Sequence, residues 1–376
     1  MILAIDGYEA NAANRVGVGR YSLELLTHMH ARIGNGASPL SAVRVYLPDR
    51  PASHMPKSAD YWKYSVRSPK TLWTFWAFPM ALRRDRPPAD VVFSPTHYLP
   101  RFVAVPKVMA IMDVSYLKYP ELFRPQDLHK LVHWTAYSVR HAAAIITISE
   151  FSKNAIIEAY NVPDSRITVA YPALSDSVGE KRNMLKTASH PKVPKRYILS
   201  VGTLQPRKNF SRLIEAFSRL SDHEIALVIV GKKGWMYEDI LSAPARFGVS
   251  DRVHFLDFVA DSDLPSLYRN AQLFALPSLY EGFGLPVLEA MVHGVPVVVS
   301  NTSSLPEIAG KAGMYVDPSD TASIVEGMSQ AIREKGTDEE KSRIALGKKL
   351  AKRFTWDRSA EVVLDVLARV AKESRP

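Results

Sequence analysis

The chain alternates short, almost wholly apolar runs with longer stretches in which apolar residues return every three or four positions. Short β-branched runs are typical of buried parallel strands, and the longer periodic stretches are typical of amphipathic helices. The runs that predict strands are residues 1–5, 43–47, 90–94, 107–112 and 144–148, then 197–201, 225–230, 252–256, 273–276 and 295–300. This alternation predicts an α/β fold with two doubly wound Rossmann-like domains in series.

The polar segment 179–196, GEKRNMLKTASHPKVPKR, interrupts the alternation and has no apolar face. We therefore predict that it links the two domains. A length of 376 residues agrees with this division, because a single hydrophobic core usually stops growing at about 250 to 300 residues. The predicted domains are residues 1–178 and 197–353, followed by an amphipathic helix within 354–376.

Open parallel sheets bind ligands beyond the carboxyl ends of their strands, so the strand-to-helix loops are where function is expected. The first such loop, RVGVGRY, places Gly17 and Gly19 before a helix. Glycines there let backbone amides approach an anion at the positive end of the helix. A simple turn explains the same residues equally well, because the full dinucleotide-binding pattern is incomplete.

The second loop, SVGTLQPRKNFSRLIEAF at 200–217, runs from a strand through Gly202 to Arg207, Lys208 and a helix. Adjacent cations at such a corner can neutralise a diphosphate, the arginine as a fork and the lysine as a point charge. A solvated basic turn is the alternative explanation.

The third loop, YEGFGLPVLEAMVHG at 280–294, holds two glutamates eight positions apart. Pro286 suits the first helical position, which predicts that Glu289 lies in the first turn and that Glu281 precedes the helix. One carboxylate can accept the hydroxyls of a ribose and the other the hydroxyls of an attached sugar. For a single glutamate, an exposed residue that favours the helix dipole would be the default explanation.

These residues also resemble a known family. The stretch 280–318 is similar to the EX7E region of retaining family 4 glycosyltransferases, and GTLQPRKN resembles their diphosphate loop. Further similar stretches are GVGRY, SPTHYLP, IMDVSYLKYPELF, ISEFSKNAI, GKKGW and FLDFVADSDLPSLYRNA. The resemblance implies the GT-B fold, with the donor on the second domain, the acceptor mainly on the first, and residues 354–376 returning to the first.

The resemblance also implies roles for individual residues. Glu289 would bind the ribose, Glu281 the transferred sugar, and Arg207 and Lys208 the diphosphate. The implied donor site consists of Gly17, Gly19, Gly202, Arg207, Lys208, Glu281, Gly282, Phe283, Gly284, Leu285 and Glu289. Family members often carry arginine directly after the glycine of the diphosphate loop, whereas this chain has Thr203 at that position. The family pattern therefore supports Lys208 more directly than Arg207 as a ligand of the diphosphate.

The expected catalytic residues are His97, Glu281, Arg207 and Lys208. His97 matches the family histidine that lies near the reacting sugar, although a lone histidine after a buried strand is more often structural. Asp113 is the candidate on the acceptor side, with capping of a loop as an equal alternative. Cations at the leaving phosphate favour the transition state, and the family retains the anomeric configuration.

No cofactor and no metal are expected. Asp261 and Asp263 resemble the DxD of metal-dependent transferases, but Pro265 follows closely, which favours a capped helix start. The absence of cysteine excludes disulfides and thiolate zinc sites. The amino terminus has no basic region or cleavage site, which indicates a first strand and the cytoplasm.

A net charge of +10 suits an anionic ligand, an acidic membrane face or a nucleic acid. Lysines and arginines are scattered and no nucleic-acid motif appears, so a nucleic-acid partner is not expected. Residues 71–86, TLWTFWAFPMALRRDR, combine aromatic and basic side chains, as at a membrane interface, but a core-facing helix is an alternative. The enzyme would then be peripheral on the inner face of the membrane.

The similarity is greatest to bacterial mannosyltransferases of surface polysaccharide assembly. It implies GDP-mannose as donor and a glycan or lipid-linked saccharide as acceptor. The alternatives are a UDP-sugar donor, or a sugar-nucleotide epimerase with a related double Rossmann architecture that would need no acceptor.

Overall fold

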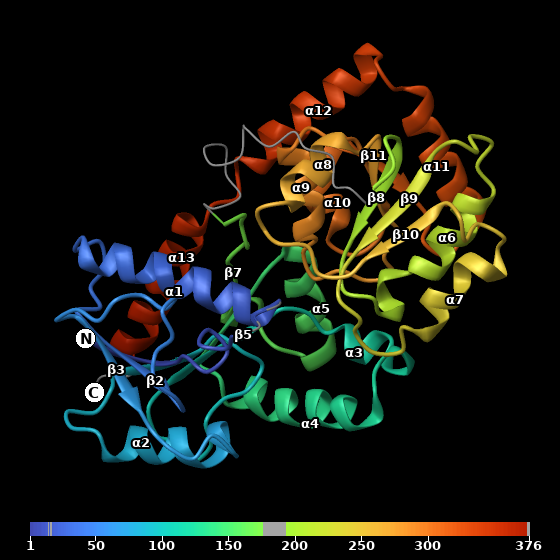
Figure 1. Ribbon diagram of the computed structural model, residues 1–376. Helices are drawn as coiled ribbons and strands as arrows, with labels where there is room; N and C mark the ends of the chain where they lie inside the picture. Colours follow the sequence, from blue (N-terminus) through green and yellow to red (C-terminus); the bar gives the residue numbers. More distant parts are fainter. Residues whose placement is uncertain (14, 16, 176–192, 374–376) are drawn as a thin grey trace. The chain divides into compact units, whose positions relative to one another are not determined.

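The computed structural model describes residues 1–13, 15, 17–175 and 193–373 (Figure 1). Residues 179–192 of the predicted linker lie outside the described residues. The chain divides into a first unit, Met1–Lys118 with Pro125–Pro172 and Thr355–Pro376, and a second unit, Tyr119–Arg124 with Ala173–Phe354. The segment Tyr119–Arg124 was predicted as part of the first domain, but it belongs to the second unit.

The first unit contains a seven-stranded parallel sheet in the order β3-β2-β1-β4-β5-β6-β7. Its strands are β1 (Ile2–Asp6), β2 (Ala42–Leu47), β3 (Trp62–Val66), β4 (Val91–Ser94), β5 (Lys107–Ile111), β6 (Ala144–Thr147) and β7 (Ile167–Val169). Strand β1 is central, because Ile5 pairs with Val45 on one side and with Phe93 on the other.

Helices and helical turns cover both faces of this sheet. They are α1 (Val18–Gly34), the π-helical η1 (Trp73–Ala77), α2 (Phe78–Arg84), α3 (Ser115–Lys118), α4 (Pro125–His141), α5 (Glu150–Tyr160), η3 (Asp164–Arg166) and α13 (Trp356–Glu373). The predicted apolar stripe of α1, with Leu26, Met29 and Ile33, is buried.

The last helix, α13, packs within the first unit. Its Trp356 ring lies 5.5 Å from that of Tyr21, and Arg32 of α1 forms 2.7 Å ion pairs with Asp357 and Glu361. The chain therefore returns to the first unit at Thr355 after completing the second.

The second unit contains a six-stranded parallel sheet in the order β10-β9-β8-β11-β12-β13. Its strands are β8 (Tyr197–Val201), β9 (Ala226–Val230), β10 (Val253–Leu256), β11 (Leu273–Leu276), β12 (Val297–Ser300) and β13 (Gly313–Val316). The strand order reverses between β8 and β11, and ligands bind at such a switch point in open α/β sheets. The loops that follow β8 and β11 therefore lie at the position where a ligand is expected.

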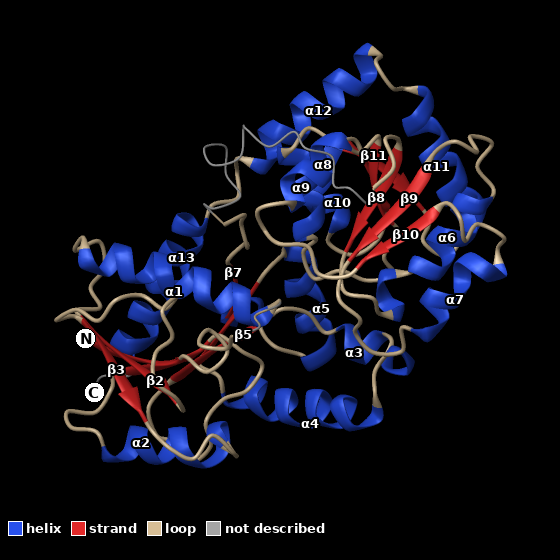
Figure 2. Cartoon of the chain, viewed as in Figure 1, coloured by secondary structure: helices blue, strands red, loops and turns tan. Residues whose placement is uncertain are grey.

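Two helical layers enclose the second sheet (Figure 2). Helices α6, α7 and α11 form one layer, and α8, α9 and α10 form the other, with α12 packed against α9. The helical elements of this unit are η2 (Pro120–Leu122), η4 (Pro206–Lys208), α6 (Phe210–Ser218), α7 (Glu238–Arg246), α8 (Leu264–Asn270), α9 (Leu285–Val292), α10 (Leu305–Ala309), η5 (Gly310–Ala312), α11 (Thr321–Arg333) and α12 (Asp338–Ala351).

The predicted strands all form, but β3, β7 and β13 were missed. Strand β3 lies at the sheet edge and buries only Trp62 fully, β7 has three residues, and β13 begins with Gly313. Such short or edge strands lack the continuous apolar run on which the prediction depended. Along the described part of the chain, no helix combines the length and the apolarity needed to cross a bilayer.

The aromatic segment 71–86 is divided between core and surface. Trp73 and Phe78 are buried and stack with ring centroids 5.7 Å apart, and the Trp73 indole donates to Asp6 Oδ1 over 2.8 Å. Trp76 is 61% exposed and Leu72 is 64% exposed. The core-facing alternative is therefore correct for Trp73 and Phe78, but not for Trp76.

Candidate functional site

The loop between β11 and α9 brings Glu281 to the switch point of the second sheet. Gly284 precedes the helix with φ of 106°, a conformation that favours glycine, and a Cβ there would lie 2.6 Å from Leu305. The helix begins at Leu285 and not at Pro286, so Glu289 is its fifth residue. The prediction that Glu289 lies in the first turn is therefore wrong, because Glu289 lies in the second turn, inside the helix.

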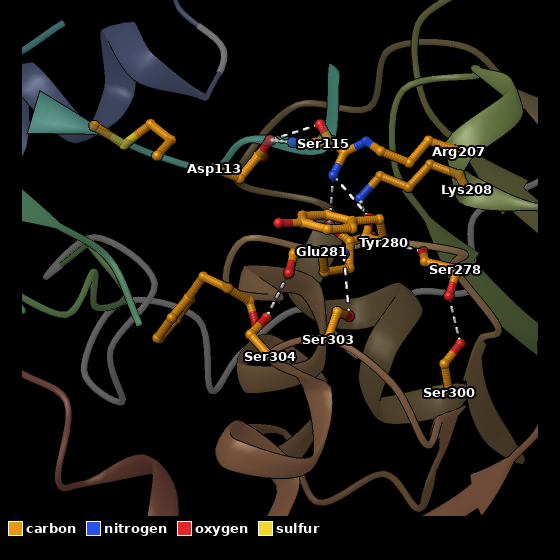
Figure 3. A network of polar contacts seen from close by, with 12 residues as sticks. Asp113, Ser115, Arg207, Lys208, Ser278, Tyr280, Glu281, Ser300, Ser303 and Ser304 are labelled. Atoms are coloured by element: carbon orange, nitrogen blue, oxygen red, sulfur yellow. Dashed lines mark hydrogen bonds and ion pairs between the residues drawn. The ribbon is translucent and has the colours of Figure 1, made fainter. Parts of the chain in front are cut away.

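Glu281 is buried and is surrounded by donors (Figure 3). Lys208 Nζ lies 2.6 Å from its Oε1 and Arg207 Nη1 lies 3.7 Å from its Oε2. Burial acts to raise the pKa of Glu281, but Lys208, Arg207 and a hydrogen bond from Ser278 outweigh it and lower the pKa below its ordinary value. Glu281 is thus held as a carboxylate in an interior site.

The loop after β8 is shaped to deliver Lys208 to this carboxylate. Its turn η4 ends at Lys208, whose stem passes so close to Gly202 that a Cβ there would lie 3.2 Å from Lys208 Cε. Asn209 follows with φ of 61° and its side-chain amide donates to the carbonyls of Pro277 and Pro318 at 2.9 and 2.8 Å. These bonds fix the β8 loop to the loops that follow β11 and β13.

Arg207 lies beside Lys208 and is directed at the same loop (Figure 3). Its Nη1 donates to the Tyr280 carbonyl over 2.8 Å, and its own carbonyl accepts from the Leu279 amide at 2.9 Å. Its side chain is 15% exposed. The two predicted diphosphate ligands, Arg207 and Lys208, are therefore brought together with Glu281.

Glu289 contacts a residue that the sequence did not identify. The hydroxyl of Tyr268, in α8, donates to Glu289 Oε2 over 2.7 Å, and both residues are buried. The His293 ring stacks on Tyr268 with centroids 5.6 Å apart. A tyrosine 21 positions earlier gives no periodic signal, so sequence analysis missed this contact.

The remaining predicted donor residues of the second unit surround the helix start. Phe283 is buried with its ring 5.4 Å from that of Phe354. Gly282 lies between Glu281 and Phe283, and Leu285 is the first residue of α9. The first amides of a helix lack intrahelical acceptors, so this end of α9 favours an anion.

Two of the predicted site residues, His97 and Asp113, belong to the first unit. His97 follows β4 and its Nε2 accepts from the Met112 amide at 3.4 Å, while burial lowers the pKa of its imidazole. Asp113 Oδ1 accepts from the Ser115 amide at 2.9 Å and from the Ser115 hydroxyl at 2.5 Å. Asp113 therefore does cap the start of α3, which was the alternative to a role in acceptor binding.

Gly17 and Gly19 do not both precede α1 as predicted. The helix begins at Val18, so Gly17 is its N-cap, with φ of 49°, and Gly19 lies in the first turn. A Cβ on Gly19 would come within 3.0 Å of the Glu9 carbonyl. Both glycines belong to the first unit, whereas the other predicted donor residues belong to the second. The prediction that Gly17 and Gly19 bind the donor together with those residues stays a prediction.

Asp263 occupies the N-cap position of α8, but its carboxylate makes no capping hydrogen bond. Its Oδ1 accepts instead from the Ser262 hydroxyl at 3.1 Å. The prediction of a capped helix start is therefore correct for the position of Asp263, which is the N-cap residue. It is wrong for the side chain, which forms no capping hydrogen bond. Among the described residues, no group of three or more histidine, aspartate or glutamate side chains is arranged to hold a metal ion.

The arrangement in the second unit can bind and neutralise a phosphorylated ligand. It joins two cations, the amide end of helix α9, and two buried carboxylates, Glu281 on the loop before that helix and Glu289 within it. Carboxylates accept hydrogen bonds from sugar hydroxyls, and the cations favour negative charge. A nucleotide sugar contains both kinds of group.

Two family profiles together match nearly the whole sequence. The profile "Glycosyl transferases group 1" matches residues 182–353, and "Glycosyltransferase Family 4" matches residues 16–177. The chain is 31% identical over 364 residues to O-antigen chain mannosyltransferase B of Escherichia coli, which covers 91% of this chain and 93% of that protein.

Solved structures of similar fold cover nearly the whole chain at low sequence identity. Sucrose-phosphate synthase from Thermosynechococcus elongatus has a TM-score of 0.77 at 15% identity and covers 99% of this chain and 100% of its own. Anabaena HepE in complex with UDP and glucose has a TM-score of 0.70 at 19% identity, with coverage of 98% and 99%. At these identities, the likeness concerns the fold.

Proposed function

Because the chain belongs to glycosyltransferase family 4, we propose that it transfers mannose from GDP-mannose to a glycan or lipid-linked saccharide, with retention of configuration. It is a glycosyltransferase with the GT-B fold. The choice of mannose is supported by the Escherichia coli relative, which is named an O-antigen chain mannosyltransferase. The product would accordingly be part of a surface polysaccharide.

The observation that carries the proposal is the cluster of buried Glu281 and Lys208 with partly buried Arg207 before the start of α9. Burying an ionised carboxylate and two cations costs free energy unless these charges pair with one another or with a ligand. A diphosphate at the helix start would take up the positive charge of Lys208 and Arg207. The sugar beyond it would then face Glu281, and the ribose would face Glu289.

The chemistry follows from where charge develops. As the bond between the anomeric carbon and the phosphate oxygen breaks, negative charge grows on the departing GDP. Lys208 and Arg207 stabilise that charge more in the transition state than in the bound donor. The acceptor oxygen forms its bond to the anomeric carbon on the same face, and its proton passes to the leaving phosphate. Glu281 stabilises the positive charge on the sugar, and no metal is required.

His97 and Asp113 are proposed for the acceptor side of the reaction. The lowered pKa of His97 keeps its imidazole neutral, so it can exchange hydrogen bonds with sugar hydroxyls. Asp113 caps α3 through Oδ1, and we assign its carboxylate in addition to the acceptor side of the reaction. The proposed catalytic set is thus His97, Glu281, Arg207 and Lys208.

We also propose that the enzyme works in the cytoplasm, on the inner face of the membrane, through an apolar patch on the first unit. This patch consists of Leu72, Trp76 and Phe102, which are 64%, 61% and 77% exposed. The Phe102 loop is tied to the 71–86 segment, because Arg83 Nε donates to the Phe102 carbonyl over 2.8 Å and the Arg101 guanidinium lies 5.0 Å from the Phe75 ring. Exposed apolar side chains beside arginines suit an anionic lipid surface.

Flotation with vesicles containing phosphatidylglycerol tests the patch. The paired change Trp76→Ser and Phe102→Ser should abolish flotation, whereas Phe258→Ser, at an exposed aromatic of the second unit, should not. Trp73 is unsuitable for this test because it is buried. Equal flotation of all three proteins would contradict membrane contact.

A donor screen tests the proposed reaction. The purified enzyme is incubated with GDP-mannose, other GDP-hexoses and UDP-hexoses, with and without EDTA, and release of nucleoside diphosphate is measured with saccharide acceptors. GDP release from GDP-mannose, dependent on acceptor and insensitive to EDTA, is expected. Release of UDP would assign a UDP-sugar donor. Conversion of the donor sugar without an acceptor would indicate an epimerase.

A further inference from the structure

The loop that carries Glu281 is held by hydroxyl groups of four serines, Ser278, Ser300, Ser303 and Ser304, here named the serine clamp (Figure 3). We propose that the serine clamp orients Glu281 for glycosyl transfer, with Ser278 as the positioning residue that acts on the carboxylate itself. This inference rests on the proposed function, because it assigns a role in the reaction to residues beside its donor site.

Ser278 forms a hydrogen bond with the side chain of Glu281. Its hydroxyl donates to Glu281 Oε1 over 2.7 Å, and Lys208 Nζ lies 2.6 Å from the same oxygen. Two donors on Oε1 define the plane of the carboxylate, because Oε2 must then point the other way. That oxygen lies 3.7 Å from Arg207 Nη1. The hydroxyl of Ser278 thereby decides which oxygen of Glu281 faces the proposed sugar.

Ser300 holds Ser278 in place. It ends strand β12, and its hydroxyl donates to the Ser278 carbonyl over 2.6 Å. Both serines are fully buried. Since β12 pairs with β11 along Val297–Val299, the rigid sheet fixes the point from which Ser278 reaches Glu281.

Ser303 and Ser304 hold the backbone of the same loop from the turn after β12. The Glu281 amide donates to Ser303 Oγ at 3.1 Å, and Ser303 has φ of 59°, a sparsely populated conformation for serine. Ser304 Oγ lies 2.9 Å from the Glu281 carbonyl and 2.8 Å from the Phe283 carbonyl. The side chain, amide and carbonyl of Glu281 are therefore each bound by a different serine.

A hydroxyl suits this position for a chemical reason. A buried carboxylate needs donors, and a third cation in place of Ser278 would attract the diphosphate or bind Glu281 too firmly. A serine donates one short hydrogen bond and adds no charge. Residues held by such outer hydrogen bonds keep the geometry that a reaction needs.

Loss of the Ser278 hydroxyl has a predictable effect on the protonation of Glu281. The charged groups that face this carboxylate are Lys208 and Arg207, and together with Ser278 they lower the pKa of Glu281 despite its burial. Without the Ser278 bond the ionised form is less favoured, so the pKa rises. The acid side of the pH profile for kcat/KM should move to higher pH.

The experiment compares wild type, Ser278→Ala and Ser200→Ala in the full-length chain. Ser200, in β8, is the matched control, because it is a serine of the same unit that is equally buried and donates to the Ala275 carbonyl over 2.6 Å, away from Glu281. We expect Ser278→Ala to lose roughly 10- to 100-fold in kcat with GDP-mannose. The KM for GDP-mannose should change little, and the acid limb of the pH profile for kcat/KM should move to higher pH. Ser200→Ala should keep the wild-type kcat and pH profile.

A second measurement does not depend on the donor. The carboxyl carbon resonance of Glu281, assigned by its loss in Glu281→Gln, is titrated in ¹³C-labelled wild type and both variants. A higher pKa in Ser278→Ala alone supports the clamp, even if the wild type turns over no GDP-mannose, a result that would count against the proposed function only. An unchanged Glu281 titration in Ser278→Ala, or equal kcat losses in Ser278→Ala and Ser200→Ala, would overturn the inference.

Discussion

Tyr268 donates its phenolic hydrogen to Oε2 of Glu289 over 2.7 Å, inside the second unit. The bond holds Oε2 of the carboxylate that we assign to the ribose. Glu289 lies in the second turn of α9, and Tyr268 lies in α8. The orientation of the Glu289 carboxylate therefore depends on both helices.

Replacement of Tyr268 by phenylalanine should weaken nucleotide binding. We expect Tyr268→Phe to raise the Kd for GDP by about tenfold, because loss of one hydrogen bond to a charged group lets the Glu289 carboxylate rotate. Isothermal titration calorimetry measures this directly. Tyr315→Phe is the control, since Tyr315 donates to the Gly310 carbonyl. Wild-type affinity in Tyr268→Phe would contradict the assigned role.

Removal of Lys208 should destabilise the fold, because it leaves Glu281 buried without its nearest cation. We expect Lys208→Met to lower the free energy of unfolding by about 3 to 5 kcal/mol, and the double variant with Glu281→Gln to recover much of that loss. Denaturant titration provides both values. In Arg196→Met, which breaks the exposed 2.7 Å pair with Asp222, the loss should stay within about 1 kcal/mol.

The same pair sets a pH dependence. The pKa of Glu281 is lowered in the folded state, so its contribution is present above the ordinary value of 4.5 and is lost as the pH falls through the folded-state value. The stability difference between wild type and Lys208→Met should therefore shrink below about pH 4.5. A difference that stays constant from pH 7 to pH 3.5 would show that Glu281 is not ionised in the fold.

His293 should make the protein sensitive to mild acid. Burial, with Arg269 and Lys348 nearby, lowers the pKa of His293 from 6.5 to about 4. Its contribution to stability is thus complete above pH 6.5 and is lost as the pH falls toward 4. His293→Gln should flatten the melting temperature over this range, whereas His254→Gln should not. An unchanged slope in His293→Gln would refute this assignment.

Asp6 is a buried carboxylate that opposes folding at neutral pH. Burial raises its pKa from 3.8 to about 6, although Trp73 and the Tyr8 amide donate to it. Folding therefore has to hold an ionised Asp6 in the interior above pH 6. Asp6→Asn should stabilise the protein by on the order of 2 kcal/mol at pH 8 and have no effect at pH 3.5. Thermal melts of Asp6→Asn and of the exposed Asp60→Asn at both pH values check this.

The fold was predictable where burial leaves a simple pattern. Strands such as β9, ALVIV, are buried on both faces and form continuous apolar runs in the sequence. The edge strand β3, WKYSV, has one fully buried residue and therefore looks like a loop. The segment Tyr119–Arg124 joined the second unit through long-range contacts, in which the Trp235 indole donates to the Leu122 carbonyl over 2.6 Å, and no local pattern reveals such a bond.

The candidate site was predictable in part for a similar reason. Gly202, Lys208, Glu281 and Glu289 lie in short motifs whose spacing indicates their chemistry. Tyr268, Ser300, Ser303 and Ser304 act through hydrogen bonds between residues 21 to 23 positions apart, whereas Ser278 lies only three positions before Glu281. A serine after a strand is common in any turn, so these residues become visible only when the loops are folded against each other.

Calorimetric titration of GDP into wild type and Glu289→Ala, beside UDP as the competing ligand, tests the central claim most directly. Our account predicts that wild type binds GDP more tightly than UDP and that Glu289→Ala loses GDP binding while keeping the wild-type melting temperature to within a few degrees. An unaltered GDP affinity in Glu289→Ala would contradict the claim that this corner of the second unit holds the nucleotide of the donor.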